Sequence, residues 1–134
     1  MVTTERRSSL VTARLPAPRR AVVGVDGGGT KTRAVILDLN DQIIGEGVAG
    51  PSNPLRVGIS NAAAAVREAI DNACEAAHVR RTDLVAAEIG LAGASRNELR
   101  ARIREALVNL GIREIIVVGD ADIALYGATE GAPA

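Results

Sequence analysis

The first apolar residues of the chain fall in short runs of the length of β-strands, and one of these runs alternates with a period of two. The run Ala21–Val25 ends at a glycine-rich stretch, and Thr32–Leu39 alternates and is rich in β-branched residues. Gln42–Ala49 follows after the dipeptide Asn40-Asp41. Such alternation is typical of half-buried strands, and a two-residue polar linker is typical of a hairpin turn. The pattern therefore predicts three antiparallel strands in a meander.

Further along the chain the apolar spacing changes to three and four residues. This spacing predicts one helix from about Ser60 to Ala77, with Ser60 as its N-cap, and a second from about Arg96 to Leu110. Leu84–Leu91 and Ile115–Val118 are apolar runs, and the second is typical of a buried parallel strand. A last helix is expected to start near Asp122.

The predicted element order is βββαβαβα. Helices after the fourth and fifth strands imply right-handed crossovers and parallel neighbours. The sequence therefore predicts an α/β fold with a mixed five-stranded sheet and flanking helices, formed by one domain over residues 21–134. Gly50–Pro54 is a loop by composition.

Residues 1–20 differ from the rest of the chain. They contain five arginines, two prolines and a single acid, Glu5, with no apolar periodicity. No apolar segment typical of a secretory signal is present in them. We expect a disordered leader, with an organelle transit peptide as the alternative.

Composition excludes several classes of function. The 134 residues contain 16 Lys+Arg and 16 Asp+Glu, so the neutral chain lacks the basic footprint of a nucleic-acid or anionic-membrane binder. Its single cysteine excludes an internal disulfide and a cysteine-cluster metal site. Tyr126 is the only aromatic residue, so stacking on bases or sugar rings is nearly unavailable. A cytoplasmic protein is the default expectation.

The strongest candidate for chemistry follows the first strand directly. Three consecutive glycines permit close approach by a ligand and positive φ, and their N–H groups can form an anion-binding concavity. The next residues add hydroxyls and the only lysine of the chain. A carboxylate beside bound phosphate is reasonable if Mg²⁺ lies between them, held through water. A glycine-rich turn with nothing bound is the alternative. The segment reads Asp26, Gly27, Gly28, Gly29, Thr30, Lys31, Thr32.

Two common phosphate-binding motifs do not fit this spacing. The Walker loop requires a glycine before the lysine, where this chain has Thr30 before Lys31. The dinucleotide fingerprint requires a third glycine where Thr32 stands, followed by a helix rather than a strand.

The stretch VVGVDGGGTKT at residues 22–32 resembles the first phosphate motif of the actin-like ATPase and sugar-kinase superfamily. Its form is similar to that of the branch holding N-acetylglucosamine kinase and the BadF/BadG/BcrA/BcrD-type ATPases. The resemblance covers residues 21–134 and implies a ribonuclease-H-like, actin-type ATPase domain. It also implies ATP and Mg²⁺ as cofactors, with Mg²⁺ held by Asp26 through water, and phosphorylation of N-acetylglucosamine or glucosamine.

Two further loops resemble segments that line the sugar site of this family. Residues 50–53 resemble a loop whose asparagine contacts the sugar, which implies that role for Asn53. Initiation of a turn before Pro54 is the alternative. Residues 90–95 resemble a strand-end turn lining the same cleft, which implies Gly93 and Ser95.

Residues 117–122 resemble the segment that carries the family's catalytic aspartate. The match implies that Asp120 contacts the sugar and acts as general base, taking the proton of the attacking hydroxyl during phosphoryl transfer. A cap or turn at Asp120 is the alternative. Asp122 is expected to be an N-cap of the following helix.

The resemblance implies that the complete enzyme has a second such domain, with nucleotide bound between the two. We therefore expect the C-terminal domain to be absent from these residues, the isolated chain to be inactive, and an exposed cleft wall to allow a homodimer.

Three other functions stay open. The first is an ATPase module that activates a partner enzyme through an iron–sulfur cluster, which the solitary Cys74 does not support. The second is a ribonuclease-H-like nuclease with Asp26 and Asp120 as metal ligands, which the neutral charge does not support. The third is a nonfunctional truncated product.

Overall fold

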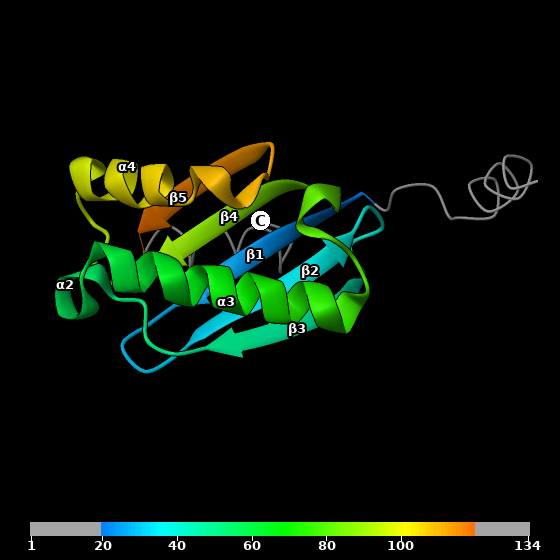
Figure 1. Cartoon of the computed structure of the whole chain (residues 1–134), viewed down its shortest axis with the longest axis horizontal. Helices are drawn as coiled ribbons and strands as arrows, with labels where there is room; N and C mark the ends of the chain where they lie inside the picture. Colours follow the sequence, from blue (N-terminus) through cyan, green and yellow to red (C-terminus); the bar gives the residue numbers. More distant parts are fainter. Residues whose placement is uncertain (1–19, 120–134) are drawn as a thin grey trace, which may run out of the picture.

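The computed structural model describes residues 20–119, which form a mixed five-stranded sheet with helices on one face (Figure 1). The strands are β1 (Ala21–Gly27), β2 (Thr32–Asp38), β3 (Ile43–Ala49), β4 (Leu84–Leu91) and β5 (Glu114–Gly119). Their order is β3-β2-β1-β4-β5. The three strands β1 to β3 pair antiparallel, whereas β4 runs parallel to both β1 and β5. The predicted meander followed by two parallel strands is confirmed.

Two long helices and three short helical turns connect the strands. They are α2 (Pro54–Val57), α3 (Ile59–Ala77), η1 (Arg81–Asp83), α4 (Asn97–Ala106) and η2 (Val108–Leu110). α3 packs along β3 and β2, and α4 packs on β5 and contacts α3 (Figure 1). The helix predicted from near Asp122 lies outside the described residues.

The start of α3 differs from the prediction. The N-cap is Gly58 rather than Ser60, and no side chain caps the helix there. Gly58 has a φ of +86°, a conformation that costs glycine little because it has no Cβ. The chain enters α3 directly from α2, so backbone geometry rather than a polar side chain sets this boundary.

The second predicted helix is divided in the structure. α4 begins at Asn97, one residue later than expected, and its α-helical part ends at Ala106. The last predicted turn is the separate 3-10 turn η2, which ends at Leu110. Gly111 then adopts a left-handed conformation with φ of +79°, as expected for the residue that closes this segment.

The core lies between the sheet and the two long helices, and it is built from aliphatic side chains. Alternate residues of β1 and β4 face the helices, and Val23, Val25 and Ile89 are almost fully buried. The predicted apolar face of α3 is confirmed, with Ile59 packed at its edge. Its buried members are Ala63, Val66, Ile70, Ala73 and Ala77.

Two glycines of β3, Gly45 and Gly47, lie directly against α3. A Cβ built on Gly45 would lie 2.6 Å from Ala77 Cβ and 2.7 Å from the Ala73 carbonyl oxygen. A Cβ built on Gly47 would overlap the Ala69 carbonyl oxygen and the Ala73 nitrogen. The missing Cβ atoms therefore let the helix backbone lie directly on the strand.

Cys74 lies on the buried side of α3, where we expect its thiol to be poorly reactive. Burial raises the pKa of this thiol to about 11, and the negative charge of Asp71 adds to the rise. Because the thiolate is the reactive form, we expect Cys74 to react with a disulfide reagent at pH 8 at least about 100-fold more slowly in the folded chain than in denaturant. Equal rates in the two conditions would contradict this packing.

The opposite face of the sheet carries no helix within residues 20–119. A shallow hollow there of about 470 Å³ includes Val22, Val35 and Ile116 in its lining. Arg33 and Glu46 form an ion pair of 2.6 Å on neighbouring strands. Among the helices of the described residues, none has both the length and the apolar character needed to cross a membrane.

Candidate functional site

The glycine-rich loop joins β1 to β2 at the carboxyl end of β1. The Gly28 nitrogen donates to the Lys31 carbonyl oxygen over 2.9 Å, which closes the turn. Gly29, Thr30 and Lys31 are exposed at its tip, and Asp26 is exposed at the end of β1. The loop therefore presents backbone N–H groups, a hydroxyl, an ammonium group and a carboxylate at one end of the sheet.

Fold geometry explains only one of the three glycines in this loop. A Cβ on Gly27 would overlap Ser52 Oγ and lie 2.5 Å from Leu91 Cδ2. A Cβ on Gly28 would make only an ordinary contact of 3.7 Å, and one on Gly29 would meet nothing within 4 Å. None of the three has the positive φ that the sequence allowed. The space around Gly29 is therefore open to a ligand.

Backbone hydrogen bonds tie this loop to the two other predicted loops. The Ala92 nitrogen donates to the Gly27 carbonyl oxygen over 2.8 Å. The Ser52 nitrogen donates to the Gly28 carbonyl oxygen over 3.1 Å. The glycine loop, residues 50–53 and the turn after β4 are therefore held together as one assembly.

The Thr32 side chain stabilises this assembly from inside. Its Oγ1 lies 2.6 Å from the Gly50 carbonyl oxygen and 2.7 Å from Ser52 Oγ, and both Thr32 and Ser52 are fully buried. Among the loop residues predicted to bind the cofactor, Thr32 thus has its hydroxyl turned inward. Its side chain shapes the loop from below, while Thr30 and Lys31 reach solvent.

Asn53 and Gly93, predicted to lie at the sugar, are in direct contact. Asn53 is the N-cap of α2, and its Oδ1 accepts from the Leu55 nitrogen over 2.9 Å. Gly93 has a φ of +85°, and a Cβ on it would overlap the Asn53 amide. The turn that sequence reasoning offered as an alternative role for Asn53 is present. It uses Oδ1, while the Nδ2 group makes no hydrogen bond to any residue in 20–119.

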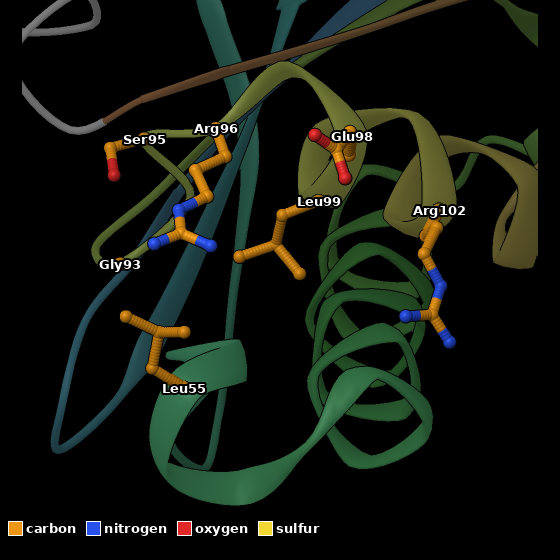
Figure 2. A pocket seen from close by; sticks show the side chains of 7 residues that line it. All are labelled: Leu55, Gly93, Ser95, Arg96, Glu98, Leu99 and Arg102. Atoms are coloured by element: carbon orange, nitrogen blue, oxygen red, sulfur yellow. The ribbon is translucent and has the colours of Figure 1, made fainter.

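A cavity of about 400 Å³ opens beside this pair (Figure 2). Its walls come from α2, from the turn after β4 and from the first two turns of α4. The lining residues are Leu55, Gly93, Ser95, Arg96, Glu98, Leu99 and Arg102. The structure thus places the predicted Ser95 at the same cavity as Gly93.

Sequence reasoning missed Leu55 and Arg96 as cavity residues. Residues 50–54 were expected to be a loop, yet Pro54 starts the short helix α2, where its missing N–H costs nothing. α2 carries Leu55, a residue that is 72% exposed. The signals available in the sequence were an arginine at a predicted helix start and a leucine directly after Pro54.

The fourth predicted site element ends at the edge of the described residues. Gly119, the last residue of β5, pairs with Leu91 of β4. Asp120, the predicted general base, is the next residue in the sequence and lies outside residues 20–119. In open α/β sheets, ligands typically bind at the carboxyl ends of the parallel strands. The glycine loop after β1 and the turn after β4 both lie at this end of the sheet.

The donor set suits a cation that keeps most of its water. Within residues 20–119 no group of three or more His, Cys, Asp or Glu side chains could enclose a metal. Asp26 offers one exposed carboxylate near the end of β1, where it also lines the hollow on the helix-free face of the sheet. Mg²⁺ typically binds through one or two carboxylates together with water and substrate phosphates. These residues therefore fit Mg²⁺ only together with a phosphate ligand.

Residues 23–134 match the BadF/BadG/BcrA/BcrD ATPase family. A curated relative, the N-acetylmuramic acid/N-acetylglucosamine kinase of Clostridium acetobutylicum, is 36% identical over 110 residues, which are 81% of this chain and 36% of that protein. The chain therefore spans about a third of the length of this relative.

Solved structures confirm the expected fold class. A proposed N-acetylglucosamine kinase from Chromobacterium violaceum superimposes with a TM-score of 0.72 at 24% identity, covering 87% of this chain and 40% of that one. A glucokinase of the ROK family from Streptomyces griseus, solved with glucose and AMPPNP, gives a TM-score of 0.59 at 23% identity, covering 85% and 38%. The described residues thus have the fold of an actin-like ATPase domain.

Proposed function

Because the chain belongs to the BadF/BadG/BcrA/BcrD ATPase family, we propose that it is the N-terminal domain of an ATP-dependent kinase that phosphorylates an amino sugar. The observation that carries this proposal is the hydrogen-bonded assembly of the loops. Through Ala92 and Ser52, it joins the glycine loop to the pair formed by Asn53 and Gly93. A phosphate donor and an acceptor bound at these two places would be held on one hydrogen-bonded support, which favours the alignment that phosphoryl transfer requires.

In this proposal the ATP phosphates lie on the glycine loop. Gly28 and Gly29 allow the phosphates to approach the backbone, Lys31 neutralises charge, and Thr30 offers a hydroxyl. Asp26 would hold Mg²⁺ through water. When bound, Mg²⁺ supplies charge stabilisation to the transferring phosphoryl group.

The acceptor side of the proposal rests on the pair Asn53 and Gly93. The free Nδ2 of Asn53 can donate to a sugar oxygen while its Oδ1 caps α2. The close backbone approach at Gly93 keeps that amide in place. The curated relative is named for N-acetylmuramic acid and N-acetylglucosamine, and we propose the same two amino sugars as candidate acceptors here.

Phosphoryl transfer needs stabilising groups on both sides of the nucleotide. Since the chain spans 36% of its curated relative, we propose that the remaining groups come from further residues, and that these 134 residues alone lack substantial kinase activity. An activator function would require cysteines to hold an iron–sulfur cluster. The one cysteine of the chain, Cys74, is buried.

The test is ADP release by a polypeptide that continues this chain to the length of its relatives. Release should depend on added N-acetylglucosamine or N-acetylmuramic acid, and a sugar phosphate should form. ATP hydrolysis at the same rate with and without sugar would contradict the proposed kinase function. It would favour an ATPase that activates a partner enzyme.

Gly29→Ala tests the nucleotide site in the same polypeptide. Because the methyl group meets no protein atom within 4 Å, we expect the melting temperature to stay unchanged. It would occupy the space assigned to the phosphates, so we expect KM for ATP to rise at least about tenfold, equivalent to ~1.4 kcal/mol. An unchanged KM for ATP would show that the ATP phosphates do not bind at this loop.

A further inference from the structure

Arg96 begins α4, a position where a cation is unfavourable. It is the N-cap of the helix, with φ of −96° and ψ of 139°, and its side chain makes no capping hydrogen bond. Helix starts favour side chains that accept hydrogen bonds from free N–H groups, and the helix dipole disfavours positive charge there. The fold of the described residues therefore gives no reason for an arginine at this position.

The Arg96 guanidinium also has no protein partner within residues 20–119. Its neighbour Arg100 differs, because it donates to the Ala94 carbonyl oxygen over 2.8 Å and to Asn97 Oδ1. Glu98, the carboxylate of the cavity, forms no ion pair with Arg96. Arg96 is thus an unneutralised cation, available to a ligand.

The surroundings of this guanidinium combine charge with apolar surface. Figure 2 shows it inside the cavity near Gly93, with Leu55 and Leu99 on its two sides. Arg102 projects from the far end of the cavity, away from Leu55. A ligand group that carries both a carboxylate and a small alkyl group would complement this part of the wall.

The cavity and the proposed sugar subsite meet at Gly93. Gly93 both lines the cavity and contacts the Asn53 amide. A substituent on a sugar held at Asn53 would therefore lie next to the cavity of about 400 Å³. The glycine loop is joined to the same two segments by the hydrogen bonds of Ser52 and Ala92.

We propose that Arg96 binds a carboxylate carried by the amino-sugar acceptor and so selects acidic amino sugars. The proposal rests on the proposed kinase function. N-acetylmuramic acid is N-acetylglucosamine with a lactyl ether, which contains one methyl group and one carboxylate. The guanidinium of Arg96 can bind the carboxylate through two parallel hydrogen bonds. Leu55 and Leu99 contact the methyl group.

The test compares two sugars in the full-length polypeptide and in its Arg96→Gln variant. We expect Arg96→Gln to lower kcat/KM for N-acetylmuramic acid at least tenfold through KM, and to change kcat/KM for N-acetylglucosamine less than twofold. Arg96→Lys should give an intermediate ratio, because lysine keeps the charge but loses the planar fork. The matched control is Arg56→Gln, which removes an exposed arginine of α2 that does not line the cavity.

Each other outcome has a distinct meaning. Equal losses for both sugars, or an unchanged ratio, would overturn the role of Arg96. A wild-type enzyme that phosphorylates N-acetylglucosamine but not N-acetylmuramic acid would overturn it while leaving the proposed kinase in place. A wild-type enzyme that phosphorylates neither sugar would contradict the proposed function itself.

Discussion

Gly47→Ala is expected to lower the free energy of unfolding of this domain by about 2–3 kcal/mol. The added methyl group would overlap the Ala69 carbonyl oxygen and the Ala73 nitrogen, which belong to the backbone of α3. A flexible side chain could move aside, but a helix backbone moves only as a unit. The helix must therefore shift away from β3 and lose packing along its buried face. Chemical denaturation of the chain followed by circular dichroism measures this loss.

Gly24→Ala is the matched control for this experiment. Gly24 is also a strand glycine, but a Cβ there would meet nothing within 4 Å. Alanine restricts the unfolded chain more than glycine does, so this variant should be as stable as the unmodified chain or more stable, by up to about 1 kcal/mol. Equal stability of the two variants would mean that α3 does not rest on β3 as described.

Asp120→Asn is expected to lower kcat of the full-length kinase by about 10²–10⁴-fold. In our proposal the carboxylate takes the proton of the attacking sugar hydroxyl, and an amide of the same size cannot. KM for ATP should change little, because Asp120 follows β5 and belongs to neither the glycine loop nor the loop after β3. Steady-state ADP release at saturating sugar measures kcat.

Asp122→Asn is the control for that substitution. It removes the same charge two residues further on, and asparagine is as good an N-cap as aspartate. We expect kcat to stay within about twofold of the unmodified enzyme, since asparagine preserves the predicted cap. If Asp120→Asn keeps a normal kcat, or if the two variants lose equal activity, Asp120 is not the general base.

The sheet could be predicted from the sequence because its signals are local. Alternation along Thr32–Asp38 and the apolar run in Glu114–Gly119 reflect which face each residue buries. Leu84–Leu91 was predicted with both of its observed ends. Helix ends were less predictable, because Ser60 has the right chemistry for a cap while the chain path places Gly58 there.

The candidate site was only partly predictable for a different reason. Gly29 stands out in the sequence because it belongs to a run of three glycines, and Lys31 because it is the only lysine of the chain. Asn53 and Gly93 stand out by resemblance. The inward turn of Thr32 depends on its contact with Ser52, 20 residues away, which no local pattern encodes. Arg96 is one of sixteen basic residues, and only its place in the cavity distinguishes it.

The shared support of the three loops has a consequence for how two ligands would bind. A nucleotide on the glycine loop would restrict the motion of Gly27 and Gly28, and through their hydrogen bonds with Ala92 and Ser52 it would restrict the sugar loops as well. The second ligand would then meet loops that have already lost part of their conformational entropy. In the proposed kinase, ATP and sugar would therefore bind with positive cooperativity, even if neither ligand touches the other.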